Sequence, residues 1–435
     1  MKKVLTYGTF DLFHQGHYNI LKRAKEEGDY LIVGVTGEVY DAERGKLSVQ
    51  DSLATRIENV RKTGFADKII VEEYLGQKIF DIMNYNVDVL VVGSDWKGKF
   101  DHLKKYCEVK YLERTKNISS TELREKMRIF SFGIATDDES DNNAILETKS
   151  VSGIHAESVY SADSKVVADF VSKYELDAGY SDYDKFLDSV DIVYIKTDIS
   201  KRAELAKRAV TAGKSVICDA PVSVNSEECA AIEKLAHDNN ACFLRNITTN
   251  YLQAFGQLLW IARSNQIGDI VSVKSRTSRK FFDDREKMSF YDIAYYAISA
   301  IIKIMGVDYE SSNCKLVKDE KGDIVFGQYN ILYENAIATA ELSMSPDLEN
   351  GMEIIGTEGS IEVPEDWWRV GYFKAKTKDK MTSTRYTSNF DGNGFRYLIR
   401  AMQLMLKQDS SIGESSQGIT TAESQAINAV IFGDK

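Results

Sequence analysis

Two successive runs of alternating strand and helix patterns constrain the fold of this chain more than any other feature of its sequence. In the first 126 residues, apolar stretches such as KKVLTYG and YLIVGVT alternate with amphipathic stretches such as SLATRIENVRKTG, which ends at a glycine. A second run of the same kind extends from RIFSFGIAT to about Asn246. Because parallel strands need crossover connections and helices supply them, each run predicts an α/β unit built on a parallel sheet, Rossmann-like in outline.

The remainder of the chain has a different pattern. Stretches such as IVSVKSRTSRK and VFGQYNILYENAIATAELSM alternate apolar and polar residues over longer distances, which favours an open, mainly antiparallel α+β sheet. A closing amphipathic helix, GFRYLIRAMQLMLK, is predicted to bury a face made of Phe395, Leu398, Ile399, Met402, Leu404 and Met405. The sequence therefore predicts three domains, at residues 1–126, 127–246 and 247–435.

Composition narrows the possible partners and compartment. The net charge of −11 argues against general nucleic-acid binding, which needs a basic surface. The chain starts directly in a strand pattern and has no apolar run near 18 residues, so we expect a cytosolic protein that does not span a membrane. Its five cysteines form no C-x-x-C pair, which favours buried free thiols in a reducing compartment.

The stretch GTFDLFHQGH places two of the five histidines, His14 and His17, where a strand and loop lead into a helix. Helix N-termini attract anions, and side chains three residues apart share one helix face. Gly8 and Gly16 keep bulk out of the same loop. The pattern predicts a cradle for a polyphosphate. The alternatives are a metal site, for which no third ligand lies nearby, and two unrelated surface histidines.

The stretch ERTKNISSTELREK closes the first run and carries a second signal. Arg114 follows the strand pattern EVKYLE, and Ser119 and Glu122 have the spacing of a capping box at a helix start. Ligands of open parallel sheets bind at the carboxyl edge, where this segment is expected to lie. By itself the segment is an ordinary helix cap. Together with the His14 loop, it is predicted to supply donors to the other side of a triphosphate.

Residues 1–126 resemble the glycerol-3-phosphate cytidylyltransferases of the H-x-G-H nucleotidyltransferase superfamily. The stretches that carry the resemblance are TYGTFDLFHQGH, GSDWKGKFD and YLERTKNISST. The last corresponds to the family pattern R-T-x-G-I-S-(S/T)-T, with Asn117 in place of the glycine, and asparagine tolerates a positive φ. The resemblance implies transfer of CMP from CTP to a polyol phosphate, with Mg²⁺ bound to the triphosphate and no metal site on the protein.

The same resemblance implies roles for particular residues. The implied catalytic residues are His14, His17, Lys46 and Arg114. The implied nucleotide site comprises Gly8, Thr9, Phe10, His14, Gly16, His17, Asp95, Arg114, Thr115, Ser119, Ser120 and Thr121. Lys46 and Lys78 are the expected anchors for the acceptor phosphate, and Arg44 could take the place of Lys46. Each of these cations could also be an ordinary solvated charge.

Residues from 128 onward resemble the Gfo/Idh/MocA oxidoreductases, which bind NAD(P) and transfer a hydride. IGDIVSV and GTEGSIEVP carry this resemblance. However, FGIATDDES stands where the family has G-x-G-x-x-G, so Asp137, Asp138 and Glu139 add negative charge near the expected phosphates. DAP replaces the family's E-K-P, which puts Ala220 at the usual lysine. Tyr296 falls at the acid/base position. We therefore expect a degenerate domain that does not bind NAD(P).

The sequence thus predicts a cytidylyltransferase that acts on a small polyol phosphate, with glycerol 3-phosphate as the first choice. Its CDP-polyol would serve the synthesis of a cell-wall polymer such as teichoic acid or of a capsule, and the C-terminal half would be a scaffold, with a homodimer expected. One alternative is a bifunctional enzyme whose C-terminal domain is an NAD(P)-dependent reductase that makes the polyol phosphate. Another is a non-catalytic nucleotide-sensing protein.

Overall fold

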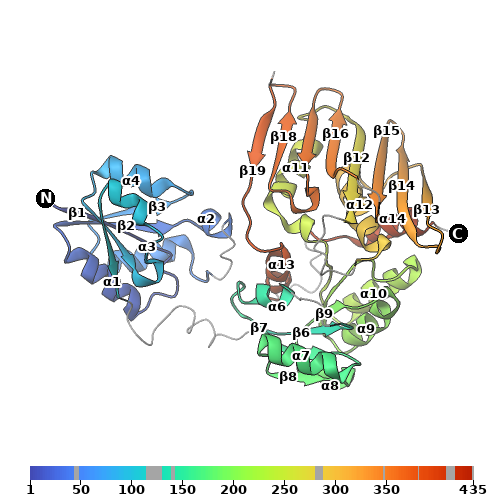
Figure 1. Cartoon of the computed structure of the whole chain (residues 1–435), viewed down its shortest axis with the longest axis horizontal. Helices are drawn as coiled ribbons and strands as arrows, with labels where there is room; N and C mark the ends of the chain where they lie inside the picture. The colour runs from blue at the N-terminus through green and yellow to red at the C-terminus, as the bar shows by residue number, and fades with distance from the viewer. Residues whose placement is uncertain are drawn as a thin grey trace. The chain divides into compact units, whose positions relative to one another are not determined.

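A computed structural model gives the fold of the chain (Figure 1). It describes residues 1–43, 49–113, 130–138, 143–279, 288–345, 348–380, 382–407 and 417–433. The chain forms two compact units. The first comprises Met1–Ile129 with Ser150–Gly153, and the second comprises Phe130–Lys149 with Ile154–Lys435.

The first unit is built on a parallel sheet in the order β3-β2-β1-β4-β5. Its strands are β1 (Lys3–Gly8), β2 (Tyr30–Thr36), β3 (Lys68–Glu72), β4 (Val89–Gly93) and β5 (Glu108–Leu112). Its helices are α1 (Gln15–Lys25), α2 (Glu38–Glu43), α3 (Leu53–Lys62) and α4 (Gln77–Tyr85), with 3₁₀ turns η1 (Ser94–Trp96) and η2 (Asp101–Lys105). Neighbouring residues of β1 face opposite sides, so Val4 and Leu5 enter two separate cores. The chain reverses direction across the sheet between β1 and β4, which is where such sheets bind ligands.

The second unit begins with another parallel sheet, in the order β11-β10-β9-β6-β7-β8. Its strands are β6 (Phe130–Thr136), β7 (Ile154–Tyr160), β8 (Ala178–Tyr180), β9 (Ile192–Lys196), β10 (Ser215–Cys218) and β11 (Phe243–Arg245). The connecting helices are α6 (Asn143–Thr148), α7 (Ser164–Tyr174), α8 (Tyr183–Asp188), α9 (Ile199–Thr211) and α10 (Ser226–Asp238). Here the strand order reverses between β6 and β9, which places the expected ligand edge at their carboxyl ends.

A mixed sheet completes the second unit, in the order β13-β14-β15-β12-β16-β17-β18-β19. Its strands are β12 (Ile270–Ser278), β13 (Ser311–Lys318), β14 (Ile324–Tyr333), β15 (Ala336–Ser343), β16 (Gly351–Gly356), β17 (Ser360–Pro364), β18 (Tyr372–Lys376) and β19 (Thr384–Thr387). The other elements are α11 (Gln253–Arg263), α12 (Phe290–Met305), α13 (Phe395–Lys407), α14 (Thr421–Phe432), η3 (Thr248–Tyr251) and η5 (Trp367–Arg369). Among the described strands of this sheet, β12 and β15 are the one pair that runs parallel. Helix α12 packs on this sheet and is buried on nearly all sides.

The predicted fold class is confirmed: two parallel α/β sheets precede a mixed, mostly antiparallel one. Three details are corrected. The stretch VFGQYNILYENAIATAELSM forms two strands, β14 and β15, because the chain turns at Glu334 and Asn335. Leu404 was wrongly placed on the buried face of α13, since it lies six residues after Leu398, off the stripe, and is 41% exposed. Cys314 is exposed on β13 rather than buried.

The structure also bears on the predictions about the membrane and about the domain boundaries. No described helix is long and apolar enough to cross a membrane. The division of the chain at residues 126 and 246 remains a prediction, since the compact units are two and the second of them contains both the second parallel sheet and the mixed sheet.

Candidate functional site

The loop between β1 and α1 carries the histidine pair. His14 is the N-cap of α1, with extended backbone angles, and its Nδ1 accepts a hydrogen bond of 3.0 Å from the backbone N–H of Gly16. Because Nδ1 accepts this bond, a neutral His14 ring carries its proton on Nε2. The ring therefore presents an N–H donor on the side away from the helix backbone.

The two imidazole rings lie against each other. The ring centroids of His14 and His17 are 3.9 Å apart, and the ring planes are inclined by 20°. Phe10 and Phe13 contact the His17 ring, each with a centroid distance of 5.5 Å. Both histidines are half-buried. The predicted sharing of one helix face is therefore present, and the aromatic contacts restrict how the His17 ring can turn.

The backbone of this loop adopts an unusual conformation. Phe10 and Leu12 have φ angles of 54° and 47°, in the left-handed region that residues with a Cβ seldom occupy. The Phe10 ring folds back onto the end of β1, where a Cβ on Gly8 would lie 2.9 Å from it. Gly8 thus makes room for Phe10, in addition to any room it leaves for a ligand. Backbone strain of this kind tends to mark functional loops.

Reciprocal side-chain bonds hold the histidine loop to the segment before α3. The carboxylate of Asp11 accepts from the backbone N–H groups of Gln50 and Asp51, at 2.9 Å each. In return, the Asp51 carboxylate accepts from the N–H of Leu12 at 2.9 Å. Asp11 is buried, so its role is to position the loop rather than to meet a ligand in solvent.

Arg56 was not predicted as a site residue, yet it joins three of the segments at this edge. Its Nη1 donates to the carbonyl oxygens of Thr9 (2.9 Å) and Thr36 (2.7 Å), and its Nε donates to that of Asp51 (3.1 Å). Its side chain has no exposed surface and lies 3.8 Å from the Asp41 carboxylate.

Lys78, on α4, lies beside acidic and aromatic groups at the carboxyl ends of β1 and β3. It forms an ion pair with Glu72, and its Nζ lies 4.4 Å above the ring of Tyr7. Tyr7 in turn donates to the Asp81 carboxylate, and burial, followed by this hydrogen bond, raises the pKa of Tyr7 well above its ordinary value. Tyr7 is therefore neutral at physiological pH. Only 17% of the Lys78 side chain is exposed, so its solvated-charge alternative is wrong.

The other predicted residues of the first unit divide into two groups. Thr9 is buried at the end of β1, and Asp95 lies exposed in η1, directly after β4. These two flank the point between β1 and β4 where the strand order reverses. The remaining candidates lie outside the described residues: Arg44, Lys46, Arg114, Thr115, Ser119, Ser120 and Thr121.

In the second unit, the described residues of β6 and just after its end include Gly133 and Asp137. A Cβ on Gly133 would lie 2.6 Å from the side chains of Phe186 and Val190, so this glycine is explained by packing within the core. Asp137 accepts from the backbone N–H of Asp198 at 2.9 Å and pairs with Lys201 at 2.8 Å. The Asp137 carboxylate at the described start of the turn after β6 is therefore paired with a lysine of α9. Glu139 lies outside the described residues.

The residues at the family's lysine and acid/base positions also have distinct surroundings. Ala220 is buried, and Asp292, four residues before Tyr296, pairs with Arg202 at 2.9 Å. Tyr296 is half-buried and lines a pocket at the carboxyl edge of the second parallel sheet. Tyr296 also packs against the hydrophobic core of the second unit.

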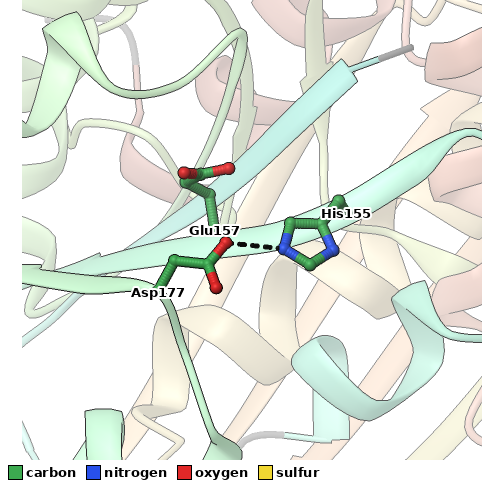
Figure 2. Close-up of side chains that lie close together, drawn as sticks. All are labelled: His155, Glu157 and Asp177. Atoms are coloured by element: carbon green, nitrogen blue, oxygen red, sulfur yellow. Dashed lines mark hydrogen bonds and ion pairs between the residues drawn. The ribbon is translucent and has the colours of Figure 1, made fainter. Parts of the chain in front are cut away.

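Three side chains on β7 and just before β8 form a cluster of possible metal ligands (Figure 2). His155 and Glu157 are on β7, and Asp177 precedes β8. His155 Nε2 lies 2.9 Å from Asp177 Oδ2, and both side chains are about half exposed. Exposed pairs of this kind contribute about 0–1 kcal/mol. We interpret the contact between His155 and Asp177 as a surface hydrogen bond that joins β7 to the start of β8, and we assign no metal to the cluster.

Comparison with known proteins finds similarity in both units. A family model described as cytidylyltransferase-like matches residues 5–126, and one described as an oxidoreductase family with an NAD-binding Rossmann fold matches residues 138–246. The glycerol-3-phosphate cytidylyltransferase of Bacillus spizizenii is 48% identical over 127 residues, which are 29% of this chain and 98% of that protein. The glycerol-3-phosphate cytidylyltransferase of Staphylococcus aureus is 43% identical over 129 residues, 29% of this chain and 96% of its own.

A structural comparison covers the second unit. The 3-ketoreductase KijD10 from Actinomadura kijaniata, solved in complex with NADP and TDP-benzene, superposes with a TM-score of 0.60. The superposition covers 70% of this chain and 98% of that one at 18% sequence identity. At this identity the comparison establishes the fold alone. The similarities fall in the same two regions in which the sequence motifs predicted them.

Proposed function

This chain belongs, through its N-terminal domain, to the cytidylyltransferase family, and we propose that it transfers CMP from CTP to a small polyol phosphate. An oxidoreductase domain of the Gfo/Idh/MocA type follows in the sequence. Glycerol 3-phosphate is the first candidate for the acceptor. The observation that carries the proposal is the stacked pair His14 and His17 at the start of α1, in a domain that spans nearly the full length of its glycerol-3-phosphate cytidylyltransferase relatives.

In the proposed reaction, an oxygen of the acceptor phosphate attacks the α-phosphorus of CTP. A new P–O bond forms, the bond between the α-phosphorus and the bridging oxygen breaks, and pyrophosphate leaves with that oxygen. The attacking phosphate is already anionic, so the protein has little need of a general base. Its task is to position the two phosphates and to stabilise the negative charge that develops on them.

His14 and His17 are suited to that task because they are preorganised. The hydrogen bond from Gly16 fixes the His14 ring, and the aromatic contacts restrict His17 before any ligand arrives. Their N–H donors can then meet the developing charge without a further cost of reorganisation. Mg²⁺ would accompany the triphosphate and neutralise part of its charge when bound.

The nucleotide and the acceptor can be tested together. With the full chain, we expect pyrophosphate release from CTP and glycerol 3-phosphate, and much slower release when ATP replaces CTP. A panel of glycerol, erythritol and ribitol phosphates then identifies the acceptor. Equal or faster reaction with ATP would reject the cytidylyl assignment, and no release with any polyol phosphate would reject the transfer itself.

We propose that Lys78 contacts the acceptor phosphate, exchanging part of its pairing with Glu72 for the substrate. Substituting Lys78 by alanine is expected to raise the KM for the polyol phosphate by about 10- to 100-fold, because a hydrogen bond to a charged group contributes about 1.5–3 kcal/mol. The KM for CTP should change much less. Steady-state kinetics with each substrate varied in turn measures both constants.

The control separates this role from simple neutralisation of Glu72. In the double variant Lys78→Ala/Glu72→Gln, a neutral amide replaces the buried carboxylate, so no counterion is needed there. If Lys78 only serves Glu72, the double variant should recover the wild-type KM for the acceptor. If Lys78 binds the acceptor, the KM should stay raised. A rise confined to CTP would move Lys78 to the nucleotide site.

We further propose that the second unit does not carry out hydride transfer. The support comes from the Asp137 carboxylate at the turn after β6 and from Ala220 at the family's lysine position. The test is to titrate the full chain into NADH or NADPH, with CTP at saturation to occupy the first unit. We expect the fluorescence of the cofactor to stay unchanged up to millimolar protein. Micromolar binding would instead favour the bifunctional enzyme, with a reductase that makes the polyol phosphate.

The wider setting follows from the chemistry of the product. A CDP-polyol is an activated donor, and we propose that it is consumed by transferases that build a polyol-phosphate polymer of the cell wall or capsule. A homodimer is also proposed. Mass measurement of the native protein tests the oligomeric state independently of the activity.

A further inference from the structure

Helix α4 in the first unit turns its apolar residues outward. Phe80 and Met83 share one side of the helix and are each 59% exposed, and Leu75, in the turn before α4, is 79% exposed. The charged residues of α4 point inward, because Asp81 is buried and Lys78 is mostly buried. A surface helix normally has the opposite arrangement, with its polar residues outside. Exposed apolar side chains gathered in this way mark a surface that another molecule covers.

A basic stretch, WKGKFDHLKKY, lies beside α4 in the segment that follows β4. Its lysines Lys97, Lys99, Lys104 and Lys105 are all exposed. Asp101 is the one acidic residue of the stretch, and it forms an ion pair with Lys104 at 3.0 Å. Within the part of the chain that the structure describes, the other three lysines form no ion pair. The stretch therefore carries an unbalanced positive charge.

The apolar and the basic residues lie on the same side of the sheet. Ile82 of α4 and Leu103 of η2 are buried in one core, against Leu5 of β1. Helices α1 and α3 cover the other side, where Leu21 and Val60 belong to a separate core (Figure 1). We call the exposed surface of α4 and of the segment containing η1 and η2 the α4–η2 face. It consists of the three apolar residues and the four lysines named above.

Trp96 joins the two parts of this face. It is 44% exposed, its ring centroid lies 5.8 Å from that of Phe100, and the Nζ of Lys99 lies 5.0 Å above its ring. Phe100 in turn lies 5.7 Å from the Nζ of Lys78 on α4. The face is therefore continuous from α4 to η1. An exposed tryptophan beside a lysine is typical of the boundary between an apolar and an aqueous phase.

The combination of apolar side chains and positive charge restricts what can cover the α4–η2 face. In a two-fold interface with a second copy, the two groups of lysines would face each other and repel. A nucleic acid would attract the lysines, but its bases stack on aromatic rings and have no need of Leu75 and Met83. The surface of an anionic bilayer offers both an apolar interior and negatively charged headgroups.

We propose that the α4–η2 face binds the surface of an anionic lipid bilayer. Leu75, Phe80 and Met83 enter the boundary between headgroups and acyl chains, and the long lysine side chains reach the lipid phosphates. The net charge of −11 does not prevent this, because charges more than about 8 Å away are largely screened at physiological ionic strength. None of these residues belongs to the proposed transfer site, so lipid binding and cytidylyl transfer stand or fail independently.

Co-sedimentation of the full chain with lipid vesicles tests the proposal. One set of vesicles is made of phosphatidylcholine alone, and the other of equal parts of phosphatidylcholine and phosphatidylglycerol. We expect binding to the mixed vesicles to be tighter by at least about tenfold, since each lysine near an anionic surface strengthens binding by roughly fivefold. Raising the salt to about 1 M, where the Debye length is about 3 Å, should remove most of this difference.

Two variants separate the contributions to binding. Lys104→Gln/Lys105→Gln should weaken binding to the mixed vesicles by about 25-fold and leave binding to phosphatidylcholine unchanged. Phe80→Gln/Met83→Gln should weaken binding to both kinds of vesicle by about tenfold or more, because less apolar area enters the bilayer. Both variants remove exposed groups, so both should keep the wild-type unfolding temperature and rate of pyrophosphate release from CTP.

The matched control is Lys22→Gln/Lys62→Gln, which removes two exposed lysines of α1 and α3 on the opposite side of the same sheet. It should bind vesicles as the wild type does, and an equal loss in this variant would place the binding elsewhere. Equally tight binding to both kinds of vesicle would also overturn the proposal. Absence of binding to either would leave an acidic protein as the occupant. A native mass, measured without vesicles, that halves in Phe80→Gln/Met83→Gln would show that a second copy covers the face instead.

Discussion

Replacing His17 by alanine is expected to lower kcat for pyrophosphate release from CTP by about 100- to 1,000-fold, the usual cost of losing one preorganised donor to a transition state. His17 is held by Phe10 and Phe13 and stacked on His14, so its ring is placed before the substrates bind. The free energy of unfolding should change little, because the ring is only half-buried. Steady-state kinetics and thermal unfolding of the same preparation measure the two quantities.

The control for this change is His102→Ala, which removes an exposed histidine of the same unit. It should leave both kcat and the unfolding temperature near their wild-type values. The variant His17→Asn keeps a hydrogen-bond donor of smaller size and should lie between the wild type and His17→Ala. If kcat of His17→Ala remains within a few-fold of the wild type, the histidine pair does not stabilise the transition state and the assignment of the site is wrong.

The outline of the fold was predictable because it depends on local patterns. Short apolar strands that alternate with amphipathic helices specify parallel sheets, and both sheets formed where that alternation was found. The errors arose where local pattern and tertiary contact diverge. Leu404 is apolar and helical, yet its angular position on α13 leaves it in solvent. Glu334 and Asn335 break a continuous alternation into a hairpin, and no residue there forces a turn as strongly as an Asn-Gly pair would.

The site was predictable in part for a similar reason. His14 and His17 lie three residues apart, so their shared helix face follows from spacing alone. Arg56 could not be identified in this way, because its acceptors at Thr9 and Thr36 are brought to it by the crossover connections of the sheet. The pocket that Tyr296 lines draws on segments that are far apart in sequence. Such sites become visible only once the strands are in register.

Replacing Arg56 by methionine is expected to destabilise the first unit by about 3–5 kcal/mol, the typical cost of removing one partner from a buried ion pair. The guanidinium is fully buried, and its loss would leave three carbonyl oxygens without this donor and the Asp41 carboxylate without the nearby positive charge. For a unit of this size, such a change lowers the unfolding temperature by about 10 to 20 °C. Calorimetry of the full chain measures this shift. The unfolding transition of the first unit is the one whose temperature rises when CTP is added, since a ligand raises the stability of the unit that binds it.

The matched control lies on the same helix. Arg61→Met removes an exposed arginine of α3 whose ion pair with Glu58 is in solvent, and it should shift the unfolding temperature by no more than about 1–2 °C. Arg56→Lys keeps the charge but cannot reach three acceptors with one planar group, so it should recover only part of the lost stability. Because Arg56 also fixes the Thr9 carbonyl at the start of the histidine loop, kcat should fall in Arg56→Met even at temperatures where the unit remains folded. Wild-type stability in Arg56→Met would mean that the three loops at this sheet edge are held together by Asp11 and Asp51 alone.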